Sequence, residues 1–328
     1  MSTIKDVARL AGVSLSTASY ALSGDSKVSQ KTRLKVLEAA KQLNYQKNGF
    51  AMDLKKSSTK TIALIFWDLA GPYYSELIKG VQEVTIANGY DLIACSSFGQ
   101  SSTGMRFLKE KRVDGAIISS QNIDDQAILD AAREGFPIIL LDQHLEGDYI
   151  THVMIDNKQG GRMAADYLIG LGHKQIGMIS GPFSSYASRN RYLGFQESLK
   201  AHGLEEQHRW VMHGRMNRKD GYQATKTLIL QGDLPTAVVY GNDEMAIGGL
   251  EAFRESGIRV PDDISIIGFD DIELAQYVNP GLTTIRQPKY EMGNLAAHVM
   301  FQALRGDIVN KSYQLQLELI ERNSCASM

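Results

Sequence analysis

The chain has 328 residues, of which 43% are hydrophobic and 22% charged, with a formal net charge of −2. This length favours two or three domains over one, because a domain usually takes ~100 to 200 residues. The two cysteines, Cys95 and Cys325, and the lack of any CxxC pair exclude a disulfide framework and a zinc site of the usual spacing.

The charges are unevenly spread along the chain. Residues 1–60 hold 11 Lys and Arg against 4 Asp and Glu, a net +7, whereas the remainder carries a net −9. A basic arm on an acidic body favours a polyanionic partner at one end, although a solvated basic helix face would give the same count. The opening MSTIKDVARL is too charged for a signal peptide, and no apolar run approaches the ~18 residues of a membrane span. We therefore expect a cytoplasmic protein without membrane contact.

Residues 1–46 contain helical patterns only and predict a small helical domain. Thr3 is placed to cap a first helix that ends at Gly12, and Ser14 is placed to cap a second helix two residues later. So tight a turn is typical of a helix-turn-helix unit. An outward stripe on the second helix would hold Leu15, Ser16, Ser19, Tyr20 and Ser23. This stripe suits a recognition helix in a DNA groove; the alternative is that Leu15 and Tyr20 pack on the next helix.

Residues 47–60 are polar and basic and predict a linker that is helical only under some conditions. From residue 61 onward, short apolar runs alternate with amphipathic stretches. The runs are TIALIFW, YDLIACS, DGAIIS, FPIILLD, QIGMIS, TAVVYG and DISIIGF. Such alternation predicts an α/β fold with parallel sheets covered on both faces.

Seven or more strands over residues 61–328 are too many for one small sheet, so we expect two doubly wound lobes. The first lobe would comprise residues 61–157 and 288–318, and the second residues 158–287 and 319–328. The strand-like SYQLQLELIER near the end suggests that the chain crosses back between the lobes.

Ligands of open α/β sheets bind at the carboxyl ends of the strands. Asp68, Asp142, Asn242 and Asp270 each follow an apolar run, and they would converge if both lobes turned these ends toward one cleft. Carboxylates and amides side by side suit a neutral polyhydroxyl ligand, since each hydroxyl donates to one group and accepts from another. Taken singly, each residue is equally suited to a helix cap or a turn.

Other functional motifs are weaker. The pair Asp270-Asp271 could hold magnesium instead. GQSSTGMR, residues 99–106, has the glycine spacing of a phosphate loop, but Met105 occupies the position of the essential lysine and excludes a Walker motif. His173 lies at a helix-to-strand turn and is expected to be structural. No nucleophile, base and orienting group share a site, so we expect no enzyme, no metal and no cofactor.

The helix-turn-helix residues belong to a longer pattern. The N-terminal part reads Thr3-x-x-Asp6-Val7-Ala8-x-x-Ala11-Gly12-Val13-Ser14, followed by Val28-Ser29, Thr32-Arg33 and Asn44-Tyr45. The body continues it with Asp114-Gly115, Asp156-Asn157, Leu171-Gly172-His173, Asn242-Asp243, Gly268-Phe269-Asp270-Asp271, Leu282-Thr283-Thr284 and Arg322-x-Ser324. Over essentially its full length the chain resembles the lactose-repressor (LacI/GalR) family. The resemblance implies a helix-turn-helix headpiece before two periplasmic-binding-protein-like lobes.

The resemblance also implies how DNA is bound. The second helix would lie in the major groove with Leu15 and Ser16 on base edges. Phosphates would be held by Thr17, Ser29 and Thr32, and the predicted DNA-binding set is completed by Thr3, Ser14, Ser19 and Tyr20. Many family members carry arginine at the position of Tyr20. Because arginine grips a guanine edge bidentately, we expect a half-site without the usual guanine preference there.

The family's linker becomes a short hinge helix on the operator, and a leucine from each subunit wedges into the minor groove. Asn48, Ala51 and Leu54 occupy the matching positions. Gly49 would weaken such a helix by up to ~1 kcal/mol relative to alanine. The alternative is a flexible linker with Leu54 against the body.

For the effector site, the resemblance points to Arg191, three residues before Gly194, and to Asn242 and Asp270. Tyr73 could stack on a sugar face, and Met216 aligns near the pocket. We therefore expect a homodimeric regulator, most simply a repressor, that binds a pseudo-palindromic double-stranded operator and a sugar-like effector. The alternatives are a solute-binding protein or a sugar-processing enzyme that uses the same cleft.

Overall fold

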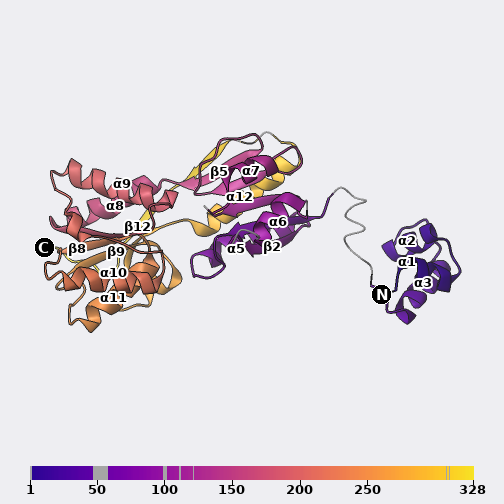
Figure 1. The fold of residues 1–328 in the computed structure, drawn as a ribbon, viewed down its shortest axis with the longest axis horizontal. Coiled ribbons are helices and arrows are strands. Elements are labelled where there is room, and N and C mark those ends of the chain that lie inside the picture. The colour runs from indigo at the N-terminus through magenta and orange to yellow at the C-terminus, as the bar shows by residue number, and fades with distance from the viewer. Residues whose placement is uncertain are drawn as a thin grey trace. The chain divides into compact units, whose positions relative to one another are not determined.

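The computed structural model describes residues 2–46, 58–98, 102–110, 112–120, 122–307, 309 and 311–328. The chain divides into two compact units, Met1–Thr59 and Lys60–Met328 (Figure 1).

The first unit consists of helices α1 (Ile4–Ala11), α2 (Leu15–Ser23) and α3 (Gln30–Gln42). Each is preceded by a hydroxyl residue whose side chain accepts the backbone N–H of the residue three positions later: Thr3, Ser14 and Ser29. Each cap contributes ~1 kcal/mol. Gly12 and Gly24 follow α1 and α2 with φ of 65° and 75°, a conformation that disfavours side chains with a Cβ. The sequence thus sets both ends of α1 and α2.

The core of this unit is built largely from small residues. Val7, Ala8, Ala18, Ala21 and Val36 are buried where the three helices meet. Alanines at the crossings let the helix axes approach closely, so the outward face of α2 remains free of core side chains.

The second unit contains two six-stranded sheets (Figure 1). The first has the order β11-β5-β4-β3-β1-β2, with every pair parallel. Its strands are β1 (Thr61–Phe66), β2 (Asp91–Ser96), β3 (Gly115–Ser119), β4 (Ile138–Leu141), β5 (Ile150–Ile155) and β11 (Ser312–Leu315). Its helices are α5 (Tyr74–Ala87), α6 (Thr103–Glu110), α7 (Asp125–Ala131) and α12 (Lys289–Leu304). We call this sheet and these helices the first lobe.

The second sheet has the order β12-β10-β9-β8-β6-β7, parallel except for the antiparallel pair β10–β12. Its strands are β6 (Ile176–Ser180), β7 (Val211–His213), β8 (Ala237–Tyr240), β9 (Ser265–Asp270), β10 (Thr283–Arg286) and β12 (Glu318–Ile320). Its helices are α8 (Asn157–Gly170), α9 (Tyr186–Ala201), α10 (Arg218–Leu230) and α11 (Asp243–Glu255), with short 3-10 turns at His208–Trp210 and Glu273–Gln276. This is the second lobe.

The central strands are buried along almost their whole length, as in β1 and β9, whereas the edge strand β2 is mostly exposed. Continuous burial explains their unbroken β-branched composition, because helices cover both faces of a parallel sheet. The α/β fold class with two doubly wound lobes behind a helix-turn-helix unit is confirmed.

The chain passes between the lobes after β5, after β10 and after β11. The run SYQLQLELIER is therefore two strands rather than one: β11 pairs with β5 of the first lobe, and β12 with β10 of the second. These three crossings bring the carboxyl ends of both sheets to one junction.

Candidate functional site

The outward face of α2 is open in the first unit. Leu15 is 46% and Tyr20 41% exposed, while Ala18 and Ala21 of the same helix are buried. Ser16 and Ser23 are exposed and Ser19 is half-buried. Leu15 and Tyr20 are therefore not core residues of this unit, and their contact with DNA stays a prediction.

The predicted phosphate-binding hydroxyls also build the helix ends. Ser14 Oγ accepts the Thr17 amide at 3.1 Å and lies 2.8 Å from its hydroxyl, and Ser29 meets Thr32 in the same way at 3.3 and 2.9 Å. The Thr3 hydroxyl donates to Asp6 at 2.7 Å. Helix N-termini favour anions, so capping is compatible with the predicted phosphate contacts of Thr17, Ser29 and Thr32.

Lys27 is a neighbour of Tyr20 that the sequence pattern did not predict. The ammonium of Lys27 lies 5.5 Å from the centre of the Tyr20 ring. The pair sets a positive charge beside the position where many relatives carry arginine. The hinge residues Asn48, Ala51 and Leu54 lie outside the described residues.

In the second unit, two glycines let α8 and α9 touch. A methyl group at Gly161 would overlap the Arg191 carbonyl, and one at Gly194 the Lys158 carbonyl. The close contact brings the buried Arg191 beside the start of α8. Its Nε donates to Asn157 Oδ1 at 2.8 Å, and its Nη1 to the Gly241 carbonyl at 2.7 Å.

Asp270 lies next to Arg191 at the end of β9. Arg191 Nη1 is 3.5 Å from Asp270 Oδ1, and Gln287 Nε2 donates to the same oxygen at 2.6 Å. The Arg191 guanidinium lies 3.6 Å from the centre of the Phe269 ring. Burial raises the pKa of Asp270, and Arg191, Lys289 and Gln287 oppose this rise.

The network continues into the first lobe. Tyr73, at the start of α5, donates its hydroxyl to Gln287 Oε1 at 3.1 Å. Burial, reinforced by the carboxylates of Asp142 and Asp270, holds the pKa of Tyr73 well above its usual value, so the hydroxyl remains a donor. Tyr73, Gln287, Asp270, Arg191 and Asn157 thus form one hydrogen-bonded chain from the first lobe to the second.

Asp142 comes to the same place from the end of β4. Its Oδ1 accepts the Ile155 amide at 3.2 Å, and its φ is 49°. Burial raises its pKa to about 6, while Arg191 and the Ile155 N–H act in the opposite direction. Asp142 is thus an ionised acceptor at neutral pH that protonates under mild acid.

The other three predicted effector residues make contacts of their own. Asn242 caps α11, its Oδ1 accepting the Met245 amide and its Nδ2 donating to the Met216 carbonyl, both at 3.1 Å. Met216 is half-buried with φ of 61°. Asp68 is exposed and accepts the Ala70 amide at 3.1 Å. Asn242 therefore shapes the loop that carries Met216.

Sequence reasoning missed three members of the site: Asn157, Gln287 and Lys289. Gln287 comes one residue after β10, so the rule of polar residues at strand ends would have found it. Ser180 and Ser188 add buried hydroxyls without a hydrogen-bond partner among the described residues. Ser188 lies three residues before Arg191 in α9.

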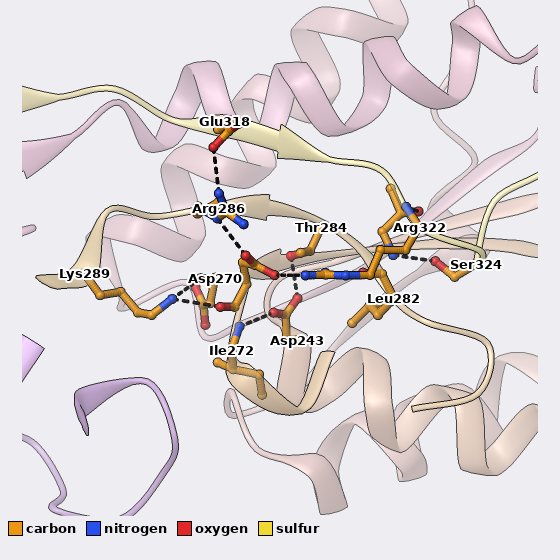
Figure 2. Close-up of polar contacts among 12 residues, drawn as sticks. Asp243, Asp270, Ile272, Leu282, Thr284, Arg286, Lys289, Glu318, Arg322 and Ser324 are labelled. Carbon is orange, nitrogen blue, oxygen red and sulfur yellow. Dashed lines mark hydrogen bonds and ion pairs between the residues drawn. The ribbon is translucent and has the colours of Figure 1, made fainter. Parts of the chain in front are cut away.

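The acidic pair does not form a cation site. The Asp271 carboxylate is paired with Arg286 and Arg322 at 2.7 Å each (Figure 2). The Asp270 carboxylate contacts Arg191 and Gln287. Within the described residues no group of three His, Cys, Asp or Glu side chains could hold a metal ion. His173 is structural: its ring contacts Thr236 Oγ1 at 2.9 Å and the Ala326 carbonyl at 3.0 Å.

Two protein-family models match the chain. A model of the lacI family of bacterial regulatory proteins matches residues 3–48, and a model of the periplasmic binding protein-like domain matches residues 165–325. The HTH-type transcriptional repressor PurR of Photobacterium profundum is 36% identical over 330 residues, 99% of this chain and 98% of that protein. PurR of Photorhabdus laumondii is 37% identical over 335 residues, covering 99% and 97%.

Solved structures show the same relationship. The lac repressor dimer bound to operator and the anti-inducer ONPF matches 99% of each chain with 29% identity and a TM-score of 0.79. The complex of the transcriptional regulator CelR with cellobiose matches 99% of this chain and 100% of that one, with 30% identity and a TM-score of 0.74.

The fold and its two sites define a DNA-binding transcriptional regulator with a small-molecule effector domain. The chain belongs to the LacI family of bacterial regulatory proteins, among relatives named as repressors. The predicted family and regulatory function are confirmed, and so is the prediction of a regulator rather than an enzyme. None of the described helices combines the length and apolar character needed to cross a membrane.

Proposed function

We propose that the chain acts in the cytoplasm as a homodimeric repressor on a pseudo-palindromic operator. Its effector, a sugar or sugar derivative, binds at the lobe junction. The observation that carries this proposal is the hydrogen-bonded chain Tyr73–Gln287–Asp270–Arg191–Asn157, which joins both lobes through buried polar groups. A ligand that competes for these groups changes the contacts of both lobes at once.

The chemistry of the junction favours a neutral, hydroxyl-rich ligand. Asp142 and Asp270 are acceptors, Arg191 is a donor, and Ser188 can act as either. The carboxylates of Asp142 and Asp270 offset the charges of Arg191 and Lys289, so these four residues carry no net positive charge to attract an anion. The Tyr73 ring offers an apolar face for a sugar ring.

On DNA, we propose that Leu15 and Ser16 contact bases and that Thr17, Ser29 and Thr32 hold phosphates. Tyr20 and Lys27 then read the position where other members use arginine. Tyrosine cannot grip guanine bidentately, so a thymine methyl or an adenine edge suits it better. Two such units must be related by a two-fold axis to read half-sites about one helical turn apart, which is why a homodimer is required.

Thermal unfolding of the full chain with cellobiose, D-ribose, nucleosides and sugar phosphates tests the effector proposal. A ligand at ~100 times its Kd adds ~2.7 kcal/mol to stability. Asp270→Asn should remove this shift, while Asp233→Asn, which changes a surface ion pair with Arg209, should keep it. A ligand that stabilises Asp270→Asn as much as the wild type would place the site elsewhere.

A further inference from the structure

The turn after β9 has an unfavourable backbone that its surroundings must hold. Asp270 and Asp271 have φ of 115° and 50°, although neither is glycine. Several contacts fix the turn (Figure 2): Arg286 and Arg322 pair with the Asp271 carboxylate, and Asp243 Oδ2 accepts the Ile272 amide at 2.9 Å. The direction of the Asp270 carboxylate, and so its contact with Arg191, depends on this turn.

Lys289 holds the backbone of the same turn. It is only 3% exposed, and its Nζ donates to the Asp270 carbonyl at 2.6 Å and the Asp271 carbonyl at 2.9 Å (Figure 2). A third oxygen, Glu76 Oε2, lies 3.3 Å away. Two carbonyl oxygens thus accept hydrogen bonds from the ammonium, and one carboxylate pairs with its charge. Burying a lysine costs free energy unless it is paired in this way.

The three oxygens around Lys289 come from both lobes. Asp270 ends β9 of the second lobe and Asp271 follows it, whereas Glu76 lies in the first turn of α5 in the first lobe. Lys289 is the first residue of α12, which packs closely against α5 because Gly80 and Gly293 face the partner helix backbone. One ammonium therefore connects the turn that carries Asp270 to the helix pair of the other lobe.

We propose that Lys289 is a positioning residue that holds the Asp270–Asp271 turn in place for the effector and, through Glu76, couples that turn to α5. The inference deepens the effector site proposed above. A ligand that displaces Asp270 changes the hydrogen bonds of Lys289. In the other direction, a displacement of α5 changes the position of Asp270 through Glu76 and Lys289.

Hydrogen–deuterium exchange of the full-length, ligand-free protein tests this role. Lys289→Met keeps the aliphatic stem and removes the donors, so exchange of the Ile272 amide should accelerate about tenfold or more through local opening. The Gly241 amide, bonded to the Ile179 carbonyl at 2.8 Å in the same lobe, should keep its rate. Arg305→Met, which removes a surface cation from the other end of α12, is the matched control.

Glu76→Gln is the second variant, because the half-exposed Glu76 tolerates substitution without loss of the fold. It should accelerate the Ile272 amide by a smaller factor and add nothing in the Lys289→Met background. An unchanged Ile272 amide in Lys289→Met, a uniform acceleration across the second lobe, or independent effects of the two substitutions would each overturn the proposal. The exchange experiment uses neither DNA nor effector. Its result therefore does not depend on whether binding assays detect the operator and effector binding proposed above.

Discussion

Replacing Arg191 with methionine should lower the free energy of unfolding, because Arg191 connects several buried polar groups at the lobe junction. Arg191 is buried, and it donates to Asn157 at 2.8 Å and to the Gly241 carbonyl at 2.7 Å, while its charge lies 3.5 Å from Asp270. Methionine fills much of the same volume but leaves two acceptors without a donor and removes the cation that is paired with the buried Asp270 carboxylate.

The loss of stability follows from these contacts. Each acceptor left without a partner costs ~1 to 3 kcal/mol, and breaking a buried ion pair by removing one side costs ~3 to 5 kcal/mol in all. Gln287 still donates to the Asp270 carboxylate at 2.6 Å, and the Lys289 ammonium stays nearby on the Asp270 carbonyl, also at 2.6 Å, so we expect the lower end, ~3 kcal/mol. Asp270→Asn in the same background should recover part of it, because the uncompensated charge disappears.

The loss should also depend on pH. Burial already raises the pKa of Asp270, and removing Arg191 takes away a cause that lowers it. The folded state then binds a proton more readily than the unfolded state, so the variant gains stability relative to the wild type as pH falls through the raised folded-state value toward 3.8. Urea denaturation at fixed protein concentration, at pH 7.5 and pH 5, measures both effects. Equal losses at the two pH values, and additive effects of Arg191→Met and Asp270→Asn, would refute the coupling of these groups.

Three further predictions concern other residues. Tyr20→Arg should shift the base preference at one position of each half-site toward guanine by ~1 to 3 kcal/mol in binding-site selection; an identical preference at every base would remove Tyr20 from the reading surface. Asp142→Asn should gain stability over the wild type, by up to ~3 kcal/mol, as pH rises from 4 to 7, since burial raises the Asp142 pKa to about 6; a pH-independent difference in urea denaturation would contradict that burial. Gly161→Ala should lower the melting temperature and weaken ligand binding together, because the added methyl separates α8 from α9; loss of neither would contradict the close packing of these helices.

The sequence pattern predicted part of the candidate site for a clear physical reason. Parallel strands deliver polar residues to one edge of a sheet, and this rule found Asp142 and Asp270. It also selected Asn242, whose side chain is used to cap α11. The strand-end rule therefore predicts which residues lie at the edge of the sheet, but it does not predict what their side chains contact.

Lys289 shows what such patterns cannot reveal. A lysine in the first turn of an amphipathic helix is normally solvated, and only the crossing of the chain between lobes buries it. The division of SYQLQLELIER into β11 and β12 has the same origin, because the strand propensity is continuous while the pairing partners lie in different lobes. Contacts between segments far apart in sequence determine both the burial of Lys289 and the division of this run into two strands.

The central claim is that, in this protein, DNA binding depends on whether an effector occupies the site at Asp270. Fluorescence anisotropy with a duplex obtained by binding-site selection, with and without the most stabilising compound of the ligand panel, measures this coupling directly. We expect the operator Kd of the wild type to change ~5-fold or more and that of Asp270→Asn to stay the same. An operator Kd that is identical with and without this compound in the wild type would contradict the account.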